Sequence, residues 1–72
     1  MKVIVYGPRA VRLYSDFVQA AQSIGGITVV RDLTDERDGH VAVVRNGHEH
    51  HLYGLGPGCA TDVLQQCLAA SL

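Results

Sequence analysis

The first thirty residues constrain the fold more than any other part of the chain, because the spacing of their apolar residues changes twice. Residues 3–6 form a nearly continuous apolar run that ends at Gly7-Pro8, which is typical of a buried strand. From residue 9 to residue 24 the apolar positions recur every three or four residues, which predicts an amphipathic helix. Residues 27–30 are again mostly apolar, and all four are β-branched. Strand, helix and strand in this order predict a βαβ unit with two parallel strands.

The second half of the chain predicts two more strands and a closing helix. Residues 31–38 hold six of the thirteen charged side chains, and both a loop and a helical turn from Thr34 to Gly39 are compatible with them. Residues 40–45 predict a third strand, Asn46-Gly47 a tight hairpin turn, and residues 48 to about 55 a fourth strand. Residues 59–72 carry apolar side chains at helical spacing. We therefore expect an α/β fold with a four-stranded mixed sheet, in the order β-α-β-β-β-α.

Length, composition and charge limit the kind of protein this is. A chain of 72 residues predicts one domain over residues 1–72, and its hydrophobic content of 47% is sufficient for a core. A net charge of −1 argues against general attraction to nucleic acid, and two cysteines are too few for a disulfide scaffold. No apolar run reaches the length of a signal peptide or a membrane span. We expect a cytoplasmic domain without nucleic-acid or membrane partners.

The order of these segments resembles that of a known family. The run Lys2-Val-Ile-Val-Tyr-Gly is followed by a helix, a second strand, the Asn46-Gly47 hairpin and a last helix, as in the smallest thioredoxin-like proteins. The resemblance covers nearly the whole chain. Residues 43–47, 53–54 and 62–68 are locally similar to the hairpin and last helix of the small redox-disulfide thioredoxins. The resemblance implies a minimal thioredoxin-like fold.

The chain departs from that family at the positions that carry its chemistry. The family has Cys-x-x-Cys at the start of the first helix, where residues 7–12 here read Gly-Pro-Arg-Ala-Val-Arg. The family's proline before the third strand is replaced by Gly39-His40, and its middle helix is reduced to residues 31–38. Disulfide exchange needs two neighbouring thiols, whereas Cys59 and Cys67 would lie about 12 Å apart along a helix. We therefore do not expect the family's redox activity here.

The missing middle helix has a consequence for association. With both helices packed on one face of the sheet, the other face is uncovered, yet residues 3–5 and 41–44 are apolar at consecutive positions. This pattern predicts that both faces are buried, and hence that a second copy or a partner protein covers the free face. The core of a chain this short also supplies only marginal stability by itself. The function we expect is that of a non-catalytic binding or assembly module, as a homo-oligomer or with a protein partner.

The histidines of the predicted hairpin suggest an alternative function. Strand alternation places His48 and His50 on one face of the sheet, and Glu49, His51 and His40 on the other. Each face then has fewer than the three or four ligands of a usual metal site, although a dimer would combine them into a zinc, nickel or copper centre. The other interpretation is a polar edge strand that discourages further strand pairing.

A second candidate site is the turn after the first strand. Gly7, Arg9 and Arg12 lie near the predicted start of the first helix, where free backbone amides and arginine side chains favour an anion such as phosphate. The sequence has no phosphate-binding glycine-rich loop there. Solvated surface arginines are the competing interpretation.

Cys59 is the third candidate. It is predicted near the amino end of the last helix, where the helix dipole promotes thiolate formation, so a thiol-dependent redox protein is a second alternative function. Cys67 lies on the apolar stripe of the same helix, and we expect it to be a small buried hydrophobic residue.

Overall fold

The computed structural model describes residues 1–34, 39–56 and 58–69 of the protein. The elements in chain order are β1 (Lys2–Tyr6), α1 (Val11–Ile24), β2 (Thr28–Asp32), β3 (Val41–Arg45), β4 (His48–Leu52) and α2 (Ala60–Ala69). The sheet has the strand order β2-β1-β3-β4; β1 is parallel to β2, and the pairs β1–β3 and β3–β4 are antiparallel. The fold is therefore the predicted α/β arrangement with a four-stranded mixed sheet and two helices.

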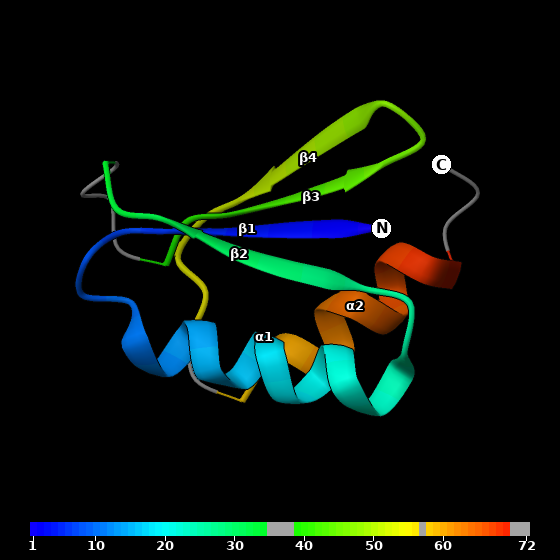
Figure 1. The fold of residues 1–72 in the computed structure, drawn as a ribbon, viewed down its shortest axis with the longest axis horizontal. Coiled ribbons are helices and arrows are strands. Elements are labelled where there is room, and N and C mark those ends of the chain that lie inside the picture. Colours follow the sequence, from blue (N-terminus) through cyan, green and yellow to red (C-terminus); the bar gives the residue numbers. More distant parts are fainter. Residues whose placement is uncertain (35–38, 57, 70–72) are drawn as a thin grey trace.

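Both helices lie on one face of the sheet (Figure 1). α1 buries Leu13, Phe17, Ala20 and Ala21 against the sheet and α2, because these side chains recur at helical spacing on one side of the helix. Every second residue of each strand points toward the helices, because successive side chains of a strand point to opposite faces of the sheet. The largest fully buried side chains are Phe17, Leu64, His40, Val3, Val5, Val41 and Val43. No helix among the described residues is long and apolar enough to cross a membrane.

The ends of several elements differ from those predicted. α1 begins at Val11 and not at residue 9, because Ala10 has φ −87° and ψ 42°, outside helical geometry. Pro8 lies in the turn before the helix. β2 occupies residues 28–32 and so includes Arg31 and Asp32, which the charge pattern assigned to the polar connection. The proposed turn between Thr34 and Gly39 falls largely outside the described residues.

The hairpin and the segment after it illustrate how glycine sets the path of the chain. Asn46 and Gly47 both have positive φ, at 53° and 79°, as a tight two-residue hairpin turn requires, so the predicted turn is confirmed. β4 ends at Leu52, three residues before the predicted end, and Gly54 then turns the chain with φ 70°. The Leu55 N–H donates to the Gly39 carbonyl oxygen at 3.2 Å, which ties this segment to the start of β3.

The chain itself leaves one face of the sheet uncovered, as the missing middle helix predicts, and burial of that face by a second copy or a partner stays a prediction. On the helix side, Val3 and Val5 are fully buried. On the other side, Ile4 is half-buried and Lys2 is exposed, because no described helix packs there. Cys67 is likewise half-buried, and not fully buried as expected, because it lies at the margin of the core.

Candidate functional site: the open face of the sheet

The face of the sheet that points away from both helices is the strongest candidate site, and we call it the open face. Its residues follow from the strand register and form three rows that run across the strands. The charged row contains Thr28, Lys2, Val44 and Glu49. The apolar row contains Val30, Ile4, Ala42 and His51. The ring row contains Asp32, Tyr6, His40 and Tyr53.

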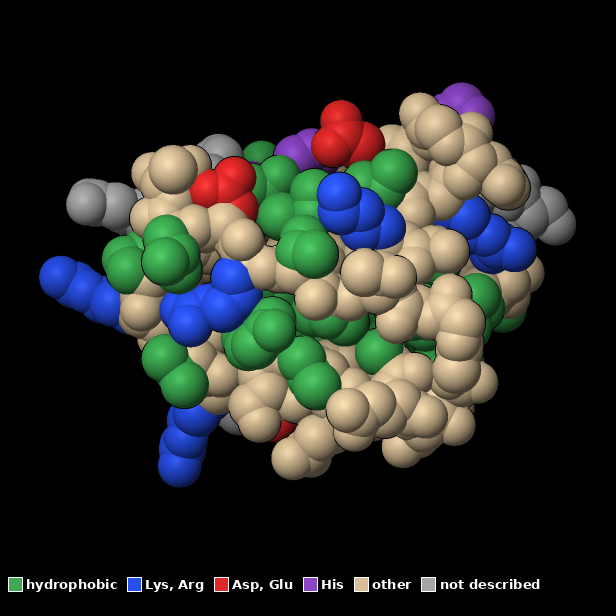
Figure 2. Space-filling view, in the orientation of Figure 1, with side chains coloured by type: hydrophobic (Ala, Val, Ile, Leu, Met, Phe, Trp, Pro, Cys, Tyr) green, Lys and Arg blue, Asp and Glu red, His purple; other side chains and the backbone are tan. Residues whose placement is uncertain are grey.

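The apolar row crosses the middle of the open face. Ile4 and Val30 of this row are half-buried, and so is Val44 of the neighbouring charged row. Ala42, beside Ile4, is fully buried by its neighbours. Figure 2 shows hydrophobic side chains together with acidic, basic and histidine side chains along the upper edge of the molecule, above the sheet. The protein's own helices leave this apolar surface in contact with solvent.

The ring row contains a stack of three rings around His40. The His40 ring lies between the rings of Tyr6 and Tyr53, with centroid distances of 4.2 and 4.4 Å and interplanar angles of 11° and 8°. His40 Nε2 lies 2.8 Å from His51 Nδ1, so one imidazole donates a hydrogen bond to the other. Stacking and this hydrogen bond account for a histidine that is only 1% exposed. Tyr53 at the end of the stack is 57% exposed.

The four histidines divide as the alternation predicts. Ala42 pairs with His51 and Val43 with His50, so His51 faces the open side and His50 the helix side. Only His40 and His51 are brought together. Within the described part of the chain, no group of three or more His, Cys, Asp or Glu side chains is placed to hold a metal ion. The zinc, nickel or copper site from His40, His48, His50 and His51 therefore stays a prediction that needs ligands from a second chain.

Tyr6 and Tyr53 are site residues that the sequence patterns did not single out. Each lies at or near the end of a predicted strand and on the same face as His40, two residues beyond Ile4 and His51 respectively. Strand alternation would therefore have placed them on the open face. Their stacking on His40 depends on side-chain packing that spacing does not show.

The turn after β1 is organised differently from the predicted anion site. The Gly7 N–H donates to the Asp32 carbonyl oxygen at 2.9 Å, so this backbone N–H is not available to bind an anion. Arg9 precedes α1, Arg12 lies in its first turn, and both side chains are exposed. Anion binding by these arginines stays a prediction.

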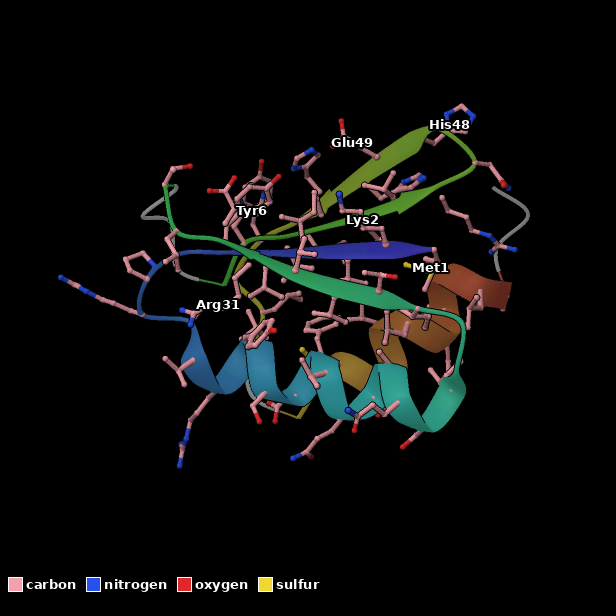
Figure 3. The ribbon with its side chains drawn as sticks, in the orientation of Figure 1. Met1, Lys2, Tyr6, Arg31, His48 and Glu49 are labelled. Atoms are coloured by element: carbon pink, nitrogen blue, oxygen red, sulfur yellow. The ribbon has the colours of Figure 1, made fainter. Side chains whose placement is uncertain are left out.

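Arg31, which no sequence pattern singled out, holds this turn against β2. Its Nη2 donates to the carbonyl oxygens of Gly7 and Pro8, at 3.3 and 3.4 Å, and its guanidinium lies 5.4 Å from the centre of the Tyr14 ring. Figure 3 shows Arg31 between the sheet and the start of α1. Its Nε is buried and has no hydrogen-bond partner among the described residues. Arg31 therefore has a structural role at the end of the sheet.

Cys59 lies one residue before α2, as predicted. The Val63 N–H donates to the Cys59 carbonyl oxygen at 3.0 Å, and the Cys59 thiol donates to the Gly56 carbonyl oxygen at 2.9 Å. Its side chain is half-buried, and both cysteines are free. Burial raises the pKa of the Cys67 thiol, and the nearby Arg45 opposes that rise. A nucleophilic role for Cys59 stays a prediction.

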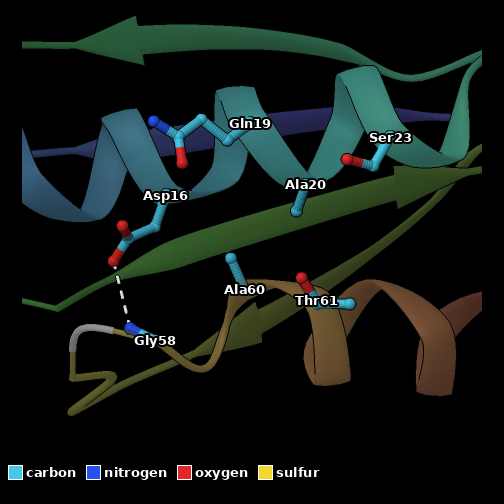
Figure 4. A pocket seen from close by; sticks show the side chains of 7 residues that line it. All are labelled: Asp16, Gln19, Ala20, Ser23, Gly58, Ala60 and Thr61. Carbon is cyan, nitrogen blue, oxygen red and sulfur yellow. Dashed lines mark hydrogen bonds between the residues drawn. The ribbon is translucent and has the colours of Figure 1, made fainter.

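A shallow polar pocket lies between α1 and α2 (Figure 4). The carboxylate Oδ2 of Asp16 accepts a hydrogen bond from the Gly58 N–H at 3.0 Å, which joins α1 to the segment before α2. Small side chains at Ala20 and Ala60 let the two helices approach. The pocket is lined by Asp16, Gln19, Ala20, Ser23, Gly58, Ala60 and Thr61. The hydrogen bond between Asp16 and Gly58 serves the packing of the helices.

Comparison with known proteins assigns no family to this arrangement. No family model matches the chain, and neither a curated protein nor a solved structure matches it significantly. The candidate site must therefore be interpreted from its own residues.

Proposed function

We propose that the protein is a non-catalytic assembly module, of minimal thioredoxin-like fold, that self-associates through the open face. The observation that carries this proposal is the apolar row of the open face, in which Ile4 and Val30 are half-buried and which no described helix covers. Contiguous apolar surface on a small protein marks sites where another surface binds. The element order β-α-β-β-β-α supports the thioredoxin-like part of the proposal.

The size of the chain favours self-association. A domain this short buries a small fraction of its surface, and covering a second face of the sheet adds stability that its own core does not supply. The open face also has the composition of a protein interface, with an apolar middle between two polar margins. A metal-handling role would require ligands beyond the His40–His51 pair.

Nuclear magnetic resonance of the isotope-labelled protein over a concentration series tests the proposal. Self-association through the open face is expected to shift the methyl signals of Ile4, Val30 and Val44 as concentration rises. The amides of Gln19 and Ser23, in the pocket between the helices, serve as the control and are expected to stay in place. Shifts that are absent at every concentration, or confined to the helix side, would contradict the proposal.

A further inference from the structure

Two opposite charges lie in one row of the open face. Lys2 pairs with Val44, and Val44 pairs with Glu49, so the two charged residues are two strands apart. This corresponds to about 10 Å across the sheet, because neighbouring strands are about 4.8 Å apart. Both residues are exposed, and neither forms an ion pair with any other described residue. Figure 3 shows Lys2 and Glu49 on the side of the sheet away from the helices.

The row pattern favours one kind of symmetry. A two-fold axis parallel to the strands, between two stacked open faces, places each row of one copy on the same row of the other. The apolar row then meets an apolar row, and β1 of one copy lies over the β3–β4 side of the other. An axis across the strands would instead place the charged row on the ring row, where Lys2 and Glu49 would not face each other. The first arrangement brings both Lys2 and Glu49 near an opposite charge, whereas the second would bring Lys2 near Asp32 of the other copy but leave Glu49 opposite Tyr53.

We propose that two copies of this chain form a two-fold dimer in which Lys2 of each copy pairs with Glu49 of the other. The inference rests on the proposed function and specifies its partner and geometry. The axis runs parallel to the strands, between the middle of the sheet and β3. For any axis in this interval, Lys2 lies within about one strand spacing of Glu49 on the facing sheet, and the long lysine side chain spans that offset. Aligned stacking of this kind is common for sheets packed face to face.

The size of the open face predicts a weak dimer. Strands of five residues, four strands wide, give a face of about 17 Å by about 19 Å. Two such faces bury less than the roughly 1,200 to 2,000 Å² of a typical stable interface. A dimer with so small an apolar contribution is sensitive to two ion pairs. We therefore expect self-association in the micromolar range or above, and a clear dependence on residues 2 and 49.

Charge reversal tests the proposed pairs. Lys2→Glu places two glutamates opposite each other in the dimer, and Glu49→Lys places two lysines opposite each other. Each single variant is expected to weaken self-association about tenfold or more in sedimentation velocity. A mixture of the two variants is expected to form heterodimers about as strong as the wild-type dimer, because both pairs then have opposite charges. The double variant is expected to self-associate like the wild type for the same reason.

The controls separate the inference from the proposed function. Asp62→Lys changes the net charge by the same amount as Glu49→Lys, but on α2 and away from the open face. It is expected to leave self-association unchanged. Both reversed side chains are exposed, so circular dichroism is expected to show an unchanged fold. Wild-type self-association with no effect of charge reversal, or mixed variants that form no heterodimer, would overturn the proposed pairs and leave the proposed function standing. A wild-type chain that stays monomeric at all concentrations would overturn both.

Discussion

Gly39 is a residue whose identity depends on the backbone around it. Its φ is 70°, and a Cβ placed there would lie 2.8 Å from the Leu55 nitrogen and 3.0 Å from the Leu55 oxygen. The same backbone accepts the hydrogen bond that ties the segment after β4 to the start of β3. Glycine is required here for both its conformation and its size.

Substitution of Gly39 by alanine is expected to destabilise the protein more than the same change at Gly26. Gly26 also has positive φ, at 73°, but a Cβ added there would meet nothing within 4 Å. Gly26→Ala therefore costs only the conformational strain, about 1 kcal/mol, and Gly39→Ala is expected to cost at least about 1 kcal/mol more. Urea denaturation of the two variants measures the difference. Equal losses of stability would contradict the steric explanation.

Arg45 and Cys67 are linked through the end of α2. Arg45 Nη1 donates to the carbonyl oxygens of Cys67 and Leu68, at 2.8 and 3.1 Å, and so satisfies the last turn of the helix. Its charge also lowers the pKa of the Cys67 thiol, against the rise caused by burial. Arg45→Met is therefore expected to raise the pKa of Cys67 further. Ultraviolet absorbance of the thiolate during a pH titration, in a Cys59→Ser background, measures this change.

The pH dependence of stability follows from the same thiol. Because the folded protein raises the pKa of Cys67, the contribution of this group to stability is complete below the ordinary pKa of a cysteine thiol. It is lost as pH rises through the raised pKa, since the thiolate is less favourable in the folded state. Cys67→Ala is expected to flatten this part of the stability profile between neutral and alkaline pH. An alkaline loss of stability of the same size in the variant would argue for another group.

At the scale of the elements, the turn between β1 and α1 depends on a side chain from β2. Arg31→Met removes the donors to Gly7 and Pro8 and the contact with Tyr14, but it also removes a buried Nε without a hydrogen-bond partner among the described residues. Because these effects oppose each other, we expect global stability to change by less than about 1 kcal/mol. Amide exchange at Ala10, which donates to Gly7, is expected to become faster. A large global loss with unchanged exchange at Ala10 would show that Arg31 stabilises the core and not the turn.

Local sequence patterns located all six elements but not all of their ends. The apolar periods and the Asn46-Gly47 turn predicted every strand and helix in the right order. The start of α1 and the end of β4 were wrong by two and three residues, since they depend on the turn at Ala10 and on the contact between Gly39 and Leu55. The contact between Gly39 and Leu55 joins residues far apart in the sequence, so no local pattern reveals it.

At the scale of the whole molecule, self-association would make thermal stability depend on concentration. A dimer that exists only in the folded state stabilises that state by mass action. We expect the Tm of the wild-type protein to rise with protein concentration, and that of Lys2→Glu to rise less over the same range. Differential scanning calorimetry measures both. A wild-type Tm independent of concentration would contradict a folded-state dimer.

The sequence by itself determined the order of the elements, the hairpin turn and the face to which each strand residue points, because these follow from local periodicity and backbone preference. It placed His40 and His51 on one face correctly, since alternation in paired strands leaves no other choice. Only the tertiary structure decided the strand order, the stack of Tyr6, His40 and Tyr53, and the half-buried state of Ile4 and Val30 on the open face. These depend on how distant segments pack together and on what covers each face, which no local pattern contains.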